Sequence, residues 1–138
     1  MKKLAFLLIG LLSALASPAM SGEIKDSESA THGSDSSRYR IVDTYAFPGF
    51  KVIQFTLPVL SVYSYLLVSN GEGLLVDPVR DIAFYLETAK KEGVKITGVY
   101  LTHSHADFVA GHTEMKKALN TTIYQSHKSG AEYSIRAV

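Results

Sequence analysis

The sequence contains no cysteine, and this absence excludes several kinds of chemistry at once. Disulfide bonds, zinc sites built from thiolates and a cysteine nucleophile are all ruled out within these 138 residues. An excess of one charge is missing as well, because 14 Lys and Arg stand against 13 Asp and Glu. Since there is neither a basic stripe nor an acidic block, we expect no nucleic acid among the partners of this protein.

The sequence also lacks an apolar run of the about 20 residues that a membrane-spanning helix needs. The run at 4–16 is shorter, follows two lysines and ends in small residues that suit cleavage after Ala16 or Ala19. This layout is typical of a secretory signal peptide. We therefore predict a signal peptide over residues 1–19, a periplasmic or secreted location and no stable membrane span.

Large apolar residues are scarce over 20–38, where Ser, Gly and charged residues predominate. Such a segment cannot bury enough surface to offset the entropy lost when it is ordered, so we predict a flexible linker. Order is expected to begin at Tyr39. The remaining length suits a single domain over 39–138.

The first half of this domain has the pattern of a β-meander. Predicted strands, rich in β-branched and aromatic residues, cover 39–47, 51–57, 62–68 and 74–76. Turn residues separate them, with Pro-Gly after the first strand and Asn-Gly after the third. The strand at 74–76 is apolar throughout, which is typical of a strand buried on both faces.

Two helical patterns follow the meander. Apolar residues recur at helical spacing over 79–93, where a glycine provides the stop, and again over 107–119. We expect the second helix to bury Met115, Ala118 and Leu119.

Strands are predicted at 96–101 and 121–124, and 125–138 has only weak patterning. The order is therefore a β-meander followed by strand–helix–strand–helix–strand. Strands that alternate with helices predict an α/β fold in layers.

Residues that can carry chemistry concentrate directly after the predicted strand 96–101. His103 and His105 are two positions apart, so both side chains point to the same side of an extended backbone. Neutral imidazole is a good ligand for zinc and iron, and the carboxylate of Asp107 can bind a metal or orient a ligand. The carboxyl end of a strand is also where α/β sheets bind ligands. We predict a metal site here; the alternative, a chance His-x-His on a surface loop, stays open.

Other polar and aromatic residues have alternative interpretations. Asp77, at the end of the strand 74–76, could cap a helix or lie beside the metal site. His112 is expected to be solvated or hydrogen-bonded, and His127, in a polar tail, is not expected to bind metal. For Tyr63 and Tyr65, which alternate on one strand, core packing is favoured over a place in a pocket wall.

Two sequence strings, one on each side of the first predicted helix, resemble a known family. GLLVDP at 73–78 and LTHSHAD at 101–107 are similar to the N-terminal half of the metallo-β-lactamase fold, an αββα sandwich. VDPVRD at 76–81 and HADFVAGH at 105–112 resemble the glyoxalase II-like branch, and most closely the persulfide dioxygenases (sulfur dioxygenases). The resemblance implies that 39–138 is a partial metallo-β-lactamase-like domain.

Phe108 departs from the hydrolytic members, in which a histidine directly after the aspartate binds a second metal. Persulfide dioxygenases, which this sequence resembles, hold one ferrous ion with two histidines and one carboxylate. The resemblance therefore implies Fe²⁺ as the cofactor, with Zn²⁺ as the alternative. It implies that His103 is the best ligand, that His105 binds metal or donates a hydrogen bond, and that Asp107 serves catalysis by orienting groups.

Three functions are compatible with this resemblance. The first is oxidation of a small thiol persulfide, such as glutathione persulfide, to sulfite. The second is zinc-dependent hydrolysis of a thioester or a β-lactam. The third is an inactive, truncated metal-binding fragment, because the remaining family ligands, a histidine and an aspartate, come from a C-terminal half that this sequence does not reach. A second polypeptide or self-association is then expected to cover an apolar face of the sheet, and activity of this chain alone is left open.

Overall fold

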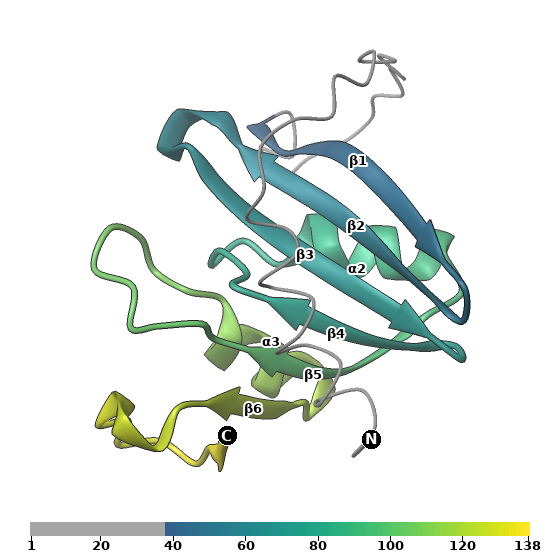
Figure 1. The fold of residues 1–138 in the computed structure, drawn as a ribbon. Coiled ribbons are helices and arrows are strands. Elements are labelled where there is room, and N and C mark those ends of the chain that lie inside the picture. Colours follow the sequence, from purple (N-terminus) through teal and green to yellow (C-terminus); the bar gives the residue numbers. More distant parts are fainter. Residues whose placement is uncertain (1–37) are drawn as a thin grey trace.

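The computed structural model describes residues 38–138, so the predicted signal peptide and nearly all of the predicted linker lie outside the described residues. The described residues form a seven-stranded sheet with two α-helices (Figure 1). The predicted α/β fold class is confirmed. Among the described residues, no helix has the length and apolar content to cross a membrane.

The strands lie in the sheet in the same order as in the sequence. The elements are β1 (Arg40–Phe47), β2 (Phe50–Leu57), η2 (Pro58–Leu60), β3 (Val62–Ser69), β4 (Glu72–Val76), α2 (Ala83–Lys91), β5 (Lys95–Tyr100), α3 (His112–Leu119), β6 (Thr122–Gln125), η3 (His127–Ser129) and β7 (Arg136–Ala137). The pairs from β1 to β4 are antiparallel, and β4 to β7 pair in parallel. Helices α2 and α3 make the crossovers that parallel neighbours require.

Local sequence explains the hairpin between β3 and β4. Asn70 and Gly71 have φ angles of 51° and 74°, and positive φ at both central residues is the geometry of a tight hairpin turn. The strand that follows is buried on both faces, as predicted, because Leu75 lies in the cluster on one face while Leu74 and Val76 lie in the cluster on the other.

Two apolar clusters lie on opposite faces of the sheet. The helix-covered cluster contains Tyr85 and Ala89 of α2 and Met115 of α3, together with residues of the central strands. The face opposite α2 and α3 carries a second cluster and is called the helix-free face, because no α-helix of residues 38–138 lies on it (Figure 1). Its buried members are Val52, Leu67, Leu74, Val76 and Tyr124. That a partner covers this face stays a prediction.

Several predicted boundaries and packing assignments were wrong. Helix α3 begins at His112 and not at 107, because 103–111 is an irregular loop held to the segment after β4. Met115 is buried as predicted, but Ala118 and Leu119 are exposed. Leu119 is 43% exposed because it ends the helix, directly before the left-handed Asn120 that turns the chain into β6.

Two further differences concern tyrosines and the C-terminal segment. Tyr63 is 51% exposed, whereas Tyr65 is half-buried against the helix-free cluster, so core packing was the wrong interpretation for Tyr63. The weakly patterned end contains η3 and the two-residue strand β7, which sequence periodicity cannot reveal at that length.

Candidate metal centre

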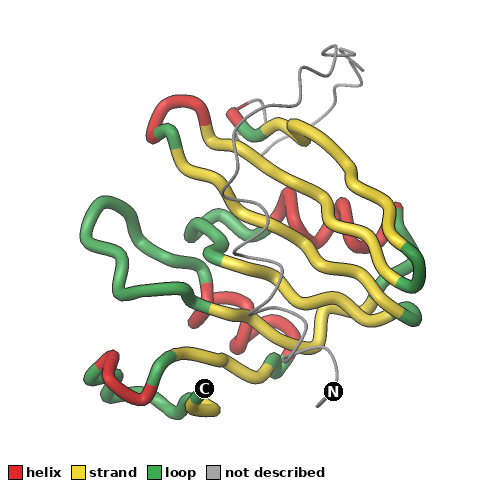
Figure 2. The backbone as a smooth tube through the Cα atoms, in the orientation of Figure 1, coloured by secondary structure: helices red, strands yellow, loops and turns green. Residues whose placement is uncertain are grey.

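The residues of the histidine motif lie where β4 and β5 end at the same edge of the sheet. In Figure 2 the long loop after β5 extends from this edge, near the shorter loop after β4. The Asp77 N–H donates to Tyr100 O over 2.9 Å, which continues the β4–β5 pairing to the end of both strands. Since the pairing is parallel, the residues that follow each strand meet at this edge.

The Asp77 carboxylate accepts three hydrogen bonds from residues of the site. Its Oδ1 accepts hydrogen bonds from the Thr102 N–H and from His105 Nε2, both over 2.9 Å. Its Oδ2 accepts from Thr102 Oγ1 over 2.6 Å. The structure thus places Asp77 beside the site, while Asp81 is the carboxylate that accepts from an N–H of α2, that of Ala83.

The two motif histidines lie side by side, with ring centroids 4.1 Å apart. His103 Nδ1 is 2.8 Å from Thr102 Oγ1, and the His105 side chain is 6% exposed, with Nδ1 buried and without a hydrogen-bond partner. One ligand atom each from Asp77, His103 and His105 lie within 4.8 Å of one another. The structure therefore brings His103 and His105 together, as expected; that they bind metal stays a prediction.

The hydrogen bonds assign the histidine tautomers and so the nitrogens that could bind a metal. The single proton of the Thr102 hydroxyl goes to the Asp77 carboxylate, so the hydroxyl oxygen must accept from His103 Nδ1. This leaves a lone pair on His103 Nε2. Because His105 Nε2 donates to Asp77, the lone pair of His105 is on its buried Nδ1.

This donor set fits a metal ion such as zinc or ferrous iron. A buried polar atom without a partner is rare, and a metal bound at His105 Nδ1 would satisfy it. Both oxygens of Asp77 already accept hydrogen bonds, so Asp77 is better suited to orient His105 than to bind the ion itself. His103 Nε2 and His105 Nδ1 are then the two protein ligands available at this edge.

Asp107, the predicted catalytic residue, lies on the open side of the site. Its side chain is 68% exposed, and its Oδ1 is 3.8 Å from the buried Nδ1 of His105. The structure thus brings Asp107 near the candidate ligand nitrogen of His105. Sequence reasoning missed Thr102; its only signal was a hydroxyl directly before the His-x-His motif.

His112 and His127 are not part of this group. The ring of His112 lies tilted against the ring of Tyr133, with centroids 4.7 Å apart, and Tyr133 donates to Gln125 Oε1 over 2.8 Å. His112 Nδ1 is buried and has no hydrogen-bond partner among the described residues; that His112 is solvated or hydrogen-bonded and not a metal ligand stays a prediction. Burial lowers the pKa of His112 below its usual value, so the ring is neutral at pH 7. His127 is exposed in η3.

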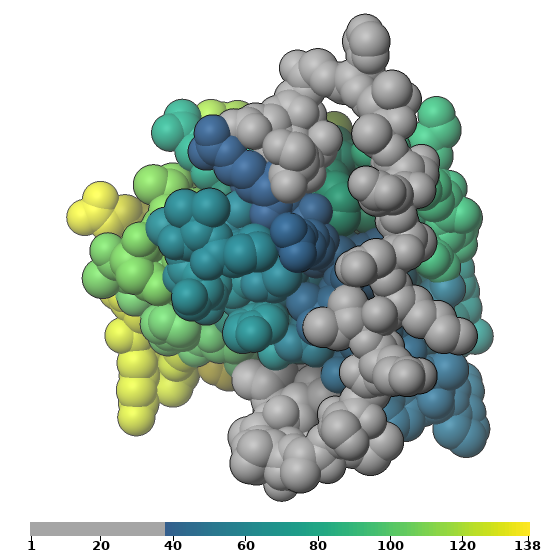
Figure 3. Space-filling model, turned by 90° about the horizontal axis from the view of Figure 1, so that it is seen from above, coloured from purple at the N-terminus to yellow at the C-terminus, as the bar shows by residue number. Residues whose placement is uncertain are grey.

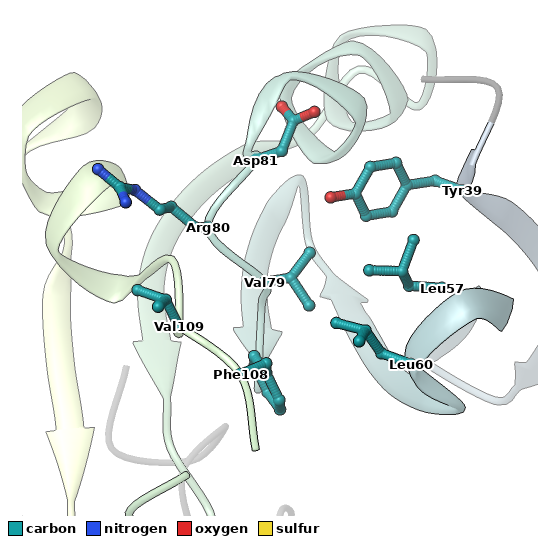
Figure 4. A pocket seen from close by; sticks show the side chains of 8 residues that line it. All are labelled: Tyr39, Leu57, Leu60, Val79, Arg80, Asp81, Phe108 and Val109. Carbon is teal, nitrogen blue, oxygen red and sulfur yellow. The ribbon is translucent and has the colours of Figure 1, made fainter. Parts of the chain in front are cut away.

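An open pocket of about 520 Å³ adjoins the site. Its lining is Tyr39, Leu57, Leu60, Val79, Arg80, Asp81, Phe108 and Val109 (Figure 4). Phe108 connects pocket and site, because its ring lies 4.2 Å from the ring of His105. The Arg80 side chain points away from the pocket in Figure 4, and its Nε is 3.5 Å from Glu114 Oε1. The pocket is therefore largely apolar.

Two segments that are distant in the sequence form opposite walls of this pocket. Leu57 ends β2 and Leu60 ends η2 in the turn that follows, whereas Phe108 and Val109 come from the loop after β5. The space-filling view shows the teal residues of this turn beside the green residues of the loop (Figure 3). A ligand in the pocket would thus contact both segments and lie against Phe108.

Comparisons with known proteins agree with this architecture. A family model described as metallo-beta-lactamase superfamily matches residues 57–136. A metallo-beta-lactamase from Staphylococcus aureus subsp. aureus COL is 38% identical, with a TM-score of 0.57, over 59% of this chain and 25% of that chain. ETHE1 from Myxococcus xanthus is 25% identical, with a TM-score of 0.58, over 62% of this chain and 39% of that chain. No match was found among curated proteins. The chain thus spans less than half the length of these two solved structures.

Proposed function

Because the chain belongs to the metallo-beta-lactamase superfamily, we propose that it serves the metal-dependent oxidation of a small thiol persulfide to sulfite. In this reaction a persulfide, dioxygen and water give a thiol and sulfite. Two findings support the proposal: the motif resembles that of persulfide dioxygenases, and the fold is similar to that of ETHE1 from Myxococcus xanthus.

The observation that carries the proposal is Phe108. A hydrolase with two metals needs a histidine at this position, and a phenyl ring offers no lone pair to a second ion. In this chain the Phe108 ring packs 4.2 Å from the His105 ring and also lines the pocket. This arrangement favours a single metal, with an apolar wall where the second metal would bind.

His103 Nε2 and His105 Nδ1 would hold the ion, with Asp77 orienting His105. Fe²⁺ is the proposed metal and Zn²⁺ the alternative. When bound, ferrous iron would supply open coordination positions and the redox chemistry that sulfur oxidation by dioxygen requires. Asp107 lies 3.8 Å from His105 Nδ1 and is placed to orient a polar group of the substrate or a water molecule.

Two nitrogen ligands are fewer than the three or four protein ligands that metal sites normally use. We propose that a second polypeptide, or a second copy of this chain, supplies the remaining ligands and covers the helix-free face. Support comes from the cluster of apolar and aromatic residues on that face, which extends to Tyr65 and Tyr100 near the ends of β4 and β5.

The test is oxygen consumption by protein loaded anaerobically with ferrous iron, using glutathione persulfide as the substrate. Uptake and sulfite formation should exceed those of His103→Ala, which removes one ligand. His127→Ala, a change at an exposed histidine in η3, serves as the matched control and should retain activity. Equal rates for the wild type and His103→Ala would refute a persulfide dioxygenase function for this chain.

A second candidate function is zinc-dependent hydrolysis of a thioester or a β-lactam. It is favoured by the 38% identity to the Staphylococcus aureus protein described as a metallo-beta-lactamase. Zinc-loaded protein would then hydrolyse S-lactoylglutathione or a chromogenic cephalosporin, and metal analysis after purification would find zinc instead of iron. Metal binding without either activity would favour the third alternative, an inactive metal-binding fragment.

The periplasmic or secreted location is likewise a proposal, since the signal peptide over 1–19 lies outside the described residues. Expression of the full sequence in a bacterial host, followed by fractionation and N-terminal sequencing, tests it. Mature protein that begins after Ala16 or Ala19 would be recovered outside the cytoplasm, whereas uncleaved protein in the cytoplasm would contradict it.

A further inference from the structure

The segment 77–79 carries a strained backbone and is held at several points. Asp77 has a φ of 45°, a left-handed conformation that is uncommon for a residue other than glycine. Its neighbour Pro78 accepts from the Gly111 N–H over 2.7 Å, and Val79 forms an isolated bridge with Ala110. Such a conformation persists only where surrounding contacts maintain it.

One of those contacts comes from the helix layer. Tyr85 of α2 is 1% exposed, and its hydroxyl is 3.2 Å from Val79 N and 2.8 Å from Ser64 Oγ of β3. The Val79 N–H can only donate, so the phenol oxygen accepts from it and the phenol proton is available for Ser64 Oγ. Edge-to-face packing on Phe55, with centroids 5.2 Å apart, fixes the ring that carries this hydroxyl.

We propose that Tyr85 is a positioning residue of the metal centre, whose hydroxyl holds Val79 and thereby keeps Asp77 in the conformation that orients His105. The inference rests on the proposed metal binding at His103 and His105. Few residues separate Tyr85 from the candidate ligand His105. Tyr85 bonds to Val79, Val79 is two residues after Asp77, and Asp77 Oδ1 accepts from His105 Nε2. The hydroxyl bonds to Ser64 and to the backbone N–H of Val79, a pocket-lining residue, so its effect on the metal centre passes along the backbone from Val79 to Asp77.

Removing the two hydrogen bonds of this hydroxyl in different variants distinguishes a positioning role from a contribution to core stability alone. Tyr85→Phe removes the acceptor of the Val79 N–H, together with the bond to Ser64. Ser64→Ala removes only the bond to β3 and leaves the bond to Val79 in place. Both variants alter the same buried cluster, so a purely structural role predicts similar effects of the two on metal binding.

The experiment measures Co²⁺ or Zn²⁺ affinity by calorimetric titration, with thermal melts of the metal-free proteins alongside. Groups that orient metal ligands typically change affinity 10- to 100-fold when they are removed. We expect Tyr85→Phe to weaken binding about tenfold and Ser64→Ala by less than about twofold, although both lower the melting temperature. Equal losses in the two variants, or wild-type affinity in Tyr85→Phe, would overturn the inference.

Amide hydrogen exchange of the metal-free wild type gives a second readout that does not depend on how a variant folds. The Val79 amide should be as protected as amides in the central strands, and Tyr85→Phe should speed exchange at Val79 and at Thr102, which donates to Asp77. Unprotected Val79 in the wild type would overturn the inference. If the wild type binds no metal but the exchange results hold, the proposed function fails while the coupling of Tyr85 to Asp77 stands.

Discussion

Asp77 accepts three hydrogen bonds with one carboxylate, and all three donors belong to the segment that follows β5. Through Thr102 and His105 this single side chain sets both histidine tautomers, and so which ring nitrogens keep a lone pair. Its left-handed backbone conformation brings an energetic cost of about 1–3 kcal/mol, which neighbouring contacts offset. The chemistry of the site therefore depends on a residue that is itself not expected to bind the ion.

Asp77→Ala should weaken metal binding about 10- to 100-fold, the usual effect of losing a group that orients a metal ligand. It also leaves the Thr102 N–H and His105 Nε2 without an acceptor, at a cost of about 1–3 kcal/mol for each buried donor. Metal titration and chemical denaturation measure the two effects. Asp81→Ala, which removes an acceptor at the start of α2, should lower stability by about 0.5–2 kcal/mol and leave metal affinity unchanged.

His112 should make stability pH-dependent, because burial lowers its pKa in the folded state below the ordinary value of 6.5. A depressed histidine pKa means that the unfolded chain binds protons more readily, so folding is most favoured above pH 6.5. Stability should then fall as the pH drops from 6.5 through the folded-state pKa. Denaturation of the metal-free protein between pH 8 and pH 5 measures this.

In His112→Phe this part of the pH dependence should be absent, because phenylalanine can stack on Tyr133 but cannot titrate. His127→Asn, at an exposed position in η3, is the matched control and should keep the wild-type profile. A pH profile of His112→Phe as steep as that of the wild type would contradict the role of this histidine.

At the scale of elements, the loop 103–111 matters because it carries the candidate ligands between β5 and α3. The Gly111 N–H and the bridge between Ala110 and Val79 attach this loop to the segment after β4. A β-carbon at Gly111 would lie only 2.3 Å from the carbonyl oxygen of Val79, although the φ of −84° suits any residue. The glycine is therefore required for close backbone approach and not for its conformation.

Gly111→Ala should force the loop away from β4, with a loss of about 1–3 kcal/mol of stability and weaker metal binding. Gly130→Ala offers a contrast, since nothing lies within 4 Å of its added β-carbon and only its φ of 67° is unfavourable. Thermal melts should show a lower melting temperature for both variants. Metal titration should show weaker binding for Gly111→Ala only. Unchanged metal affinity in Gly111→Ala would show that the loop tolerates the displacement.

At the scale of the whole molecule, the helices α2 and α3 of residues 38–138 both lie on one face of the sheet (Figure 1). The other face carries large apolar and aromatic side chains, among them Leu67, Leu74 and Tyr124. These three side chains are buried within the chain, and layered folds usually pack a further layer of protein against an apolar sheet face. We propose that the partner that packs on this face also supplies the remaining metal ligands.

A purified protein of residues 38–138 should therefore sediment as a species larger than one chain, or should gain stability when a companion polypeptide binds. Analytical ultracentrifugation and thermal melting at several concentrations test this, because association makes the melting temperature concentration-dependent. A monomer with a cooperative, concentration-independent transition would contradict the need for a partner on the helix-free face.

The sequence alone determined the α/β class, the meander, the stop of the first helix and the position of the His-x-His motif after a buried strand. These features are local, since they depend on periodicity, turn residues and spacing within about ten positions. The start of α3 could not be derived in this way, because contacts of 110 and 111 with the segment after β4 keep 107–111 out of the helix.

Only the tertiary structure decided which hydrogen bonds the motif residues make. Asp77 and His105 are 28 positions apart, and the parallel pairing of β4 with β5 brings them to 2.9 Å. The same pairing gives Thr102 its acceptor and leaves a lone pair on His105 Nδ1. The reason is physical: residue types and spacing define which donors a chain carries, but the direction of each lone pair follows from hydrogen bonds between segments that are distant in the sequence.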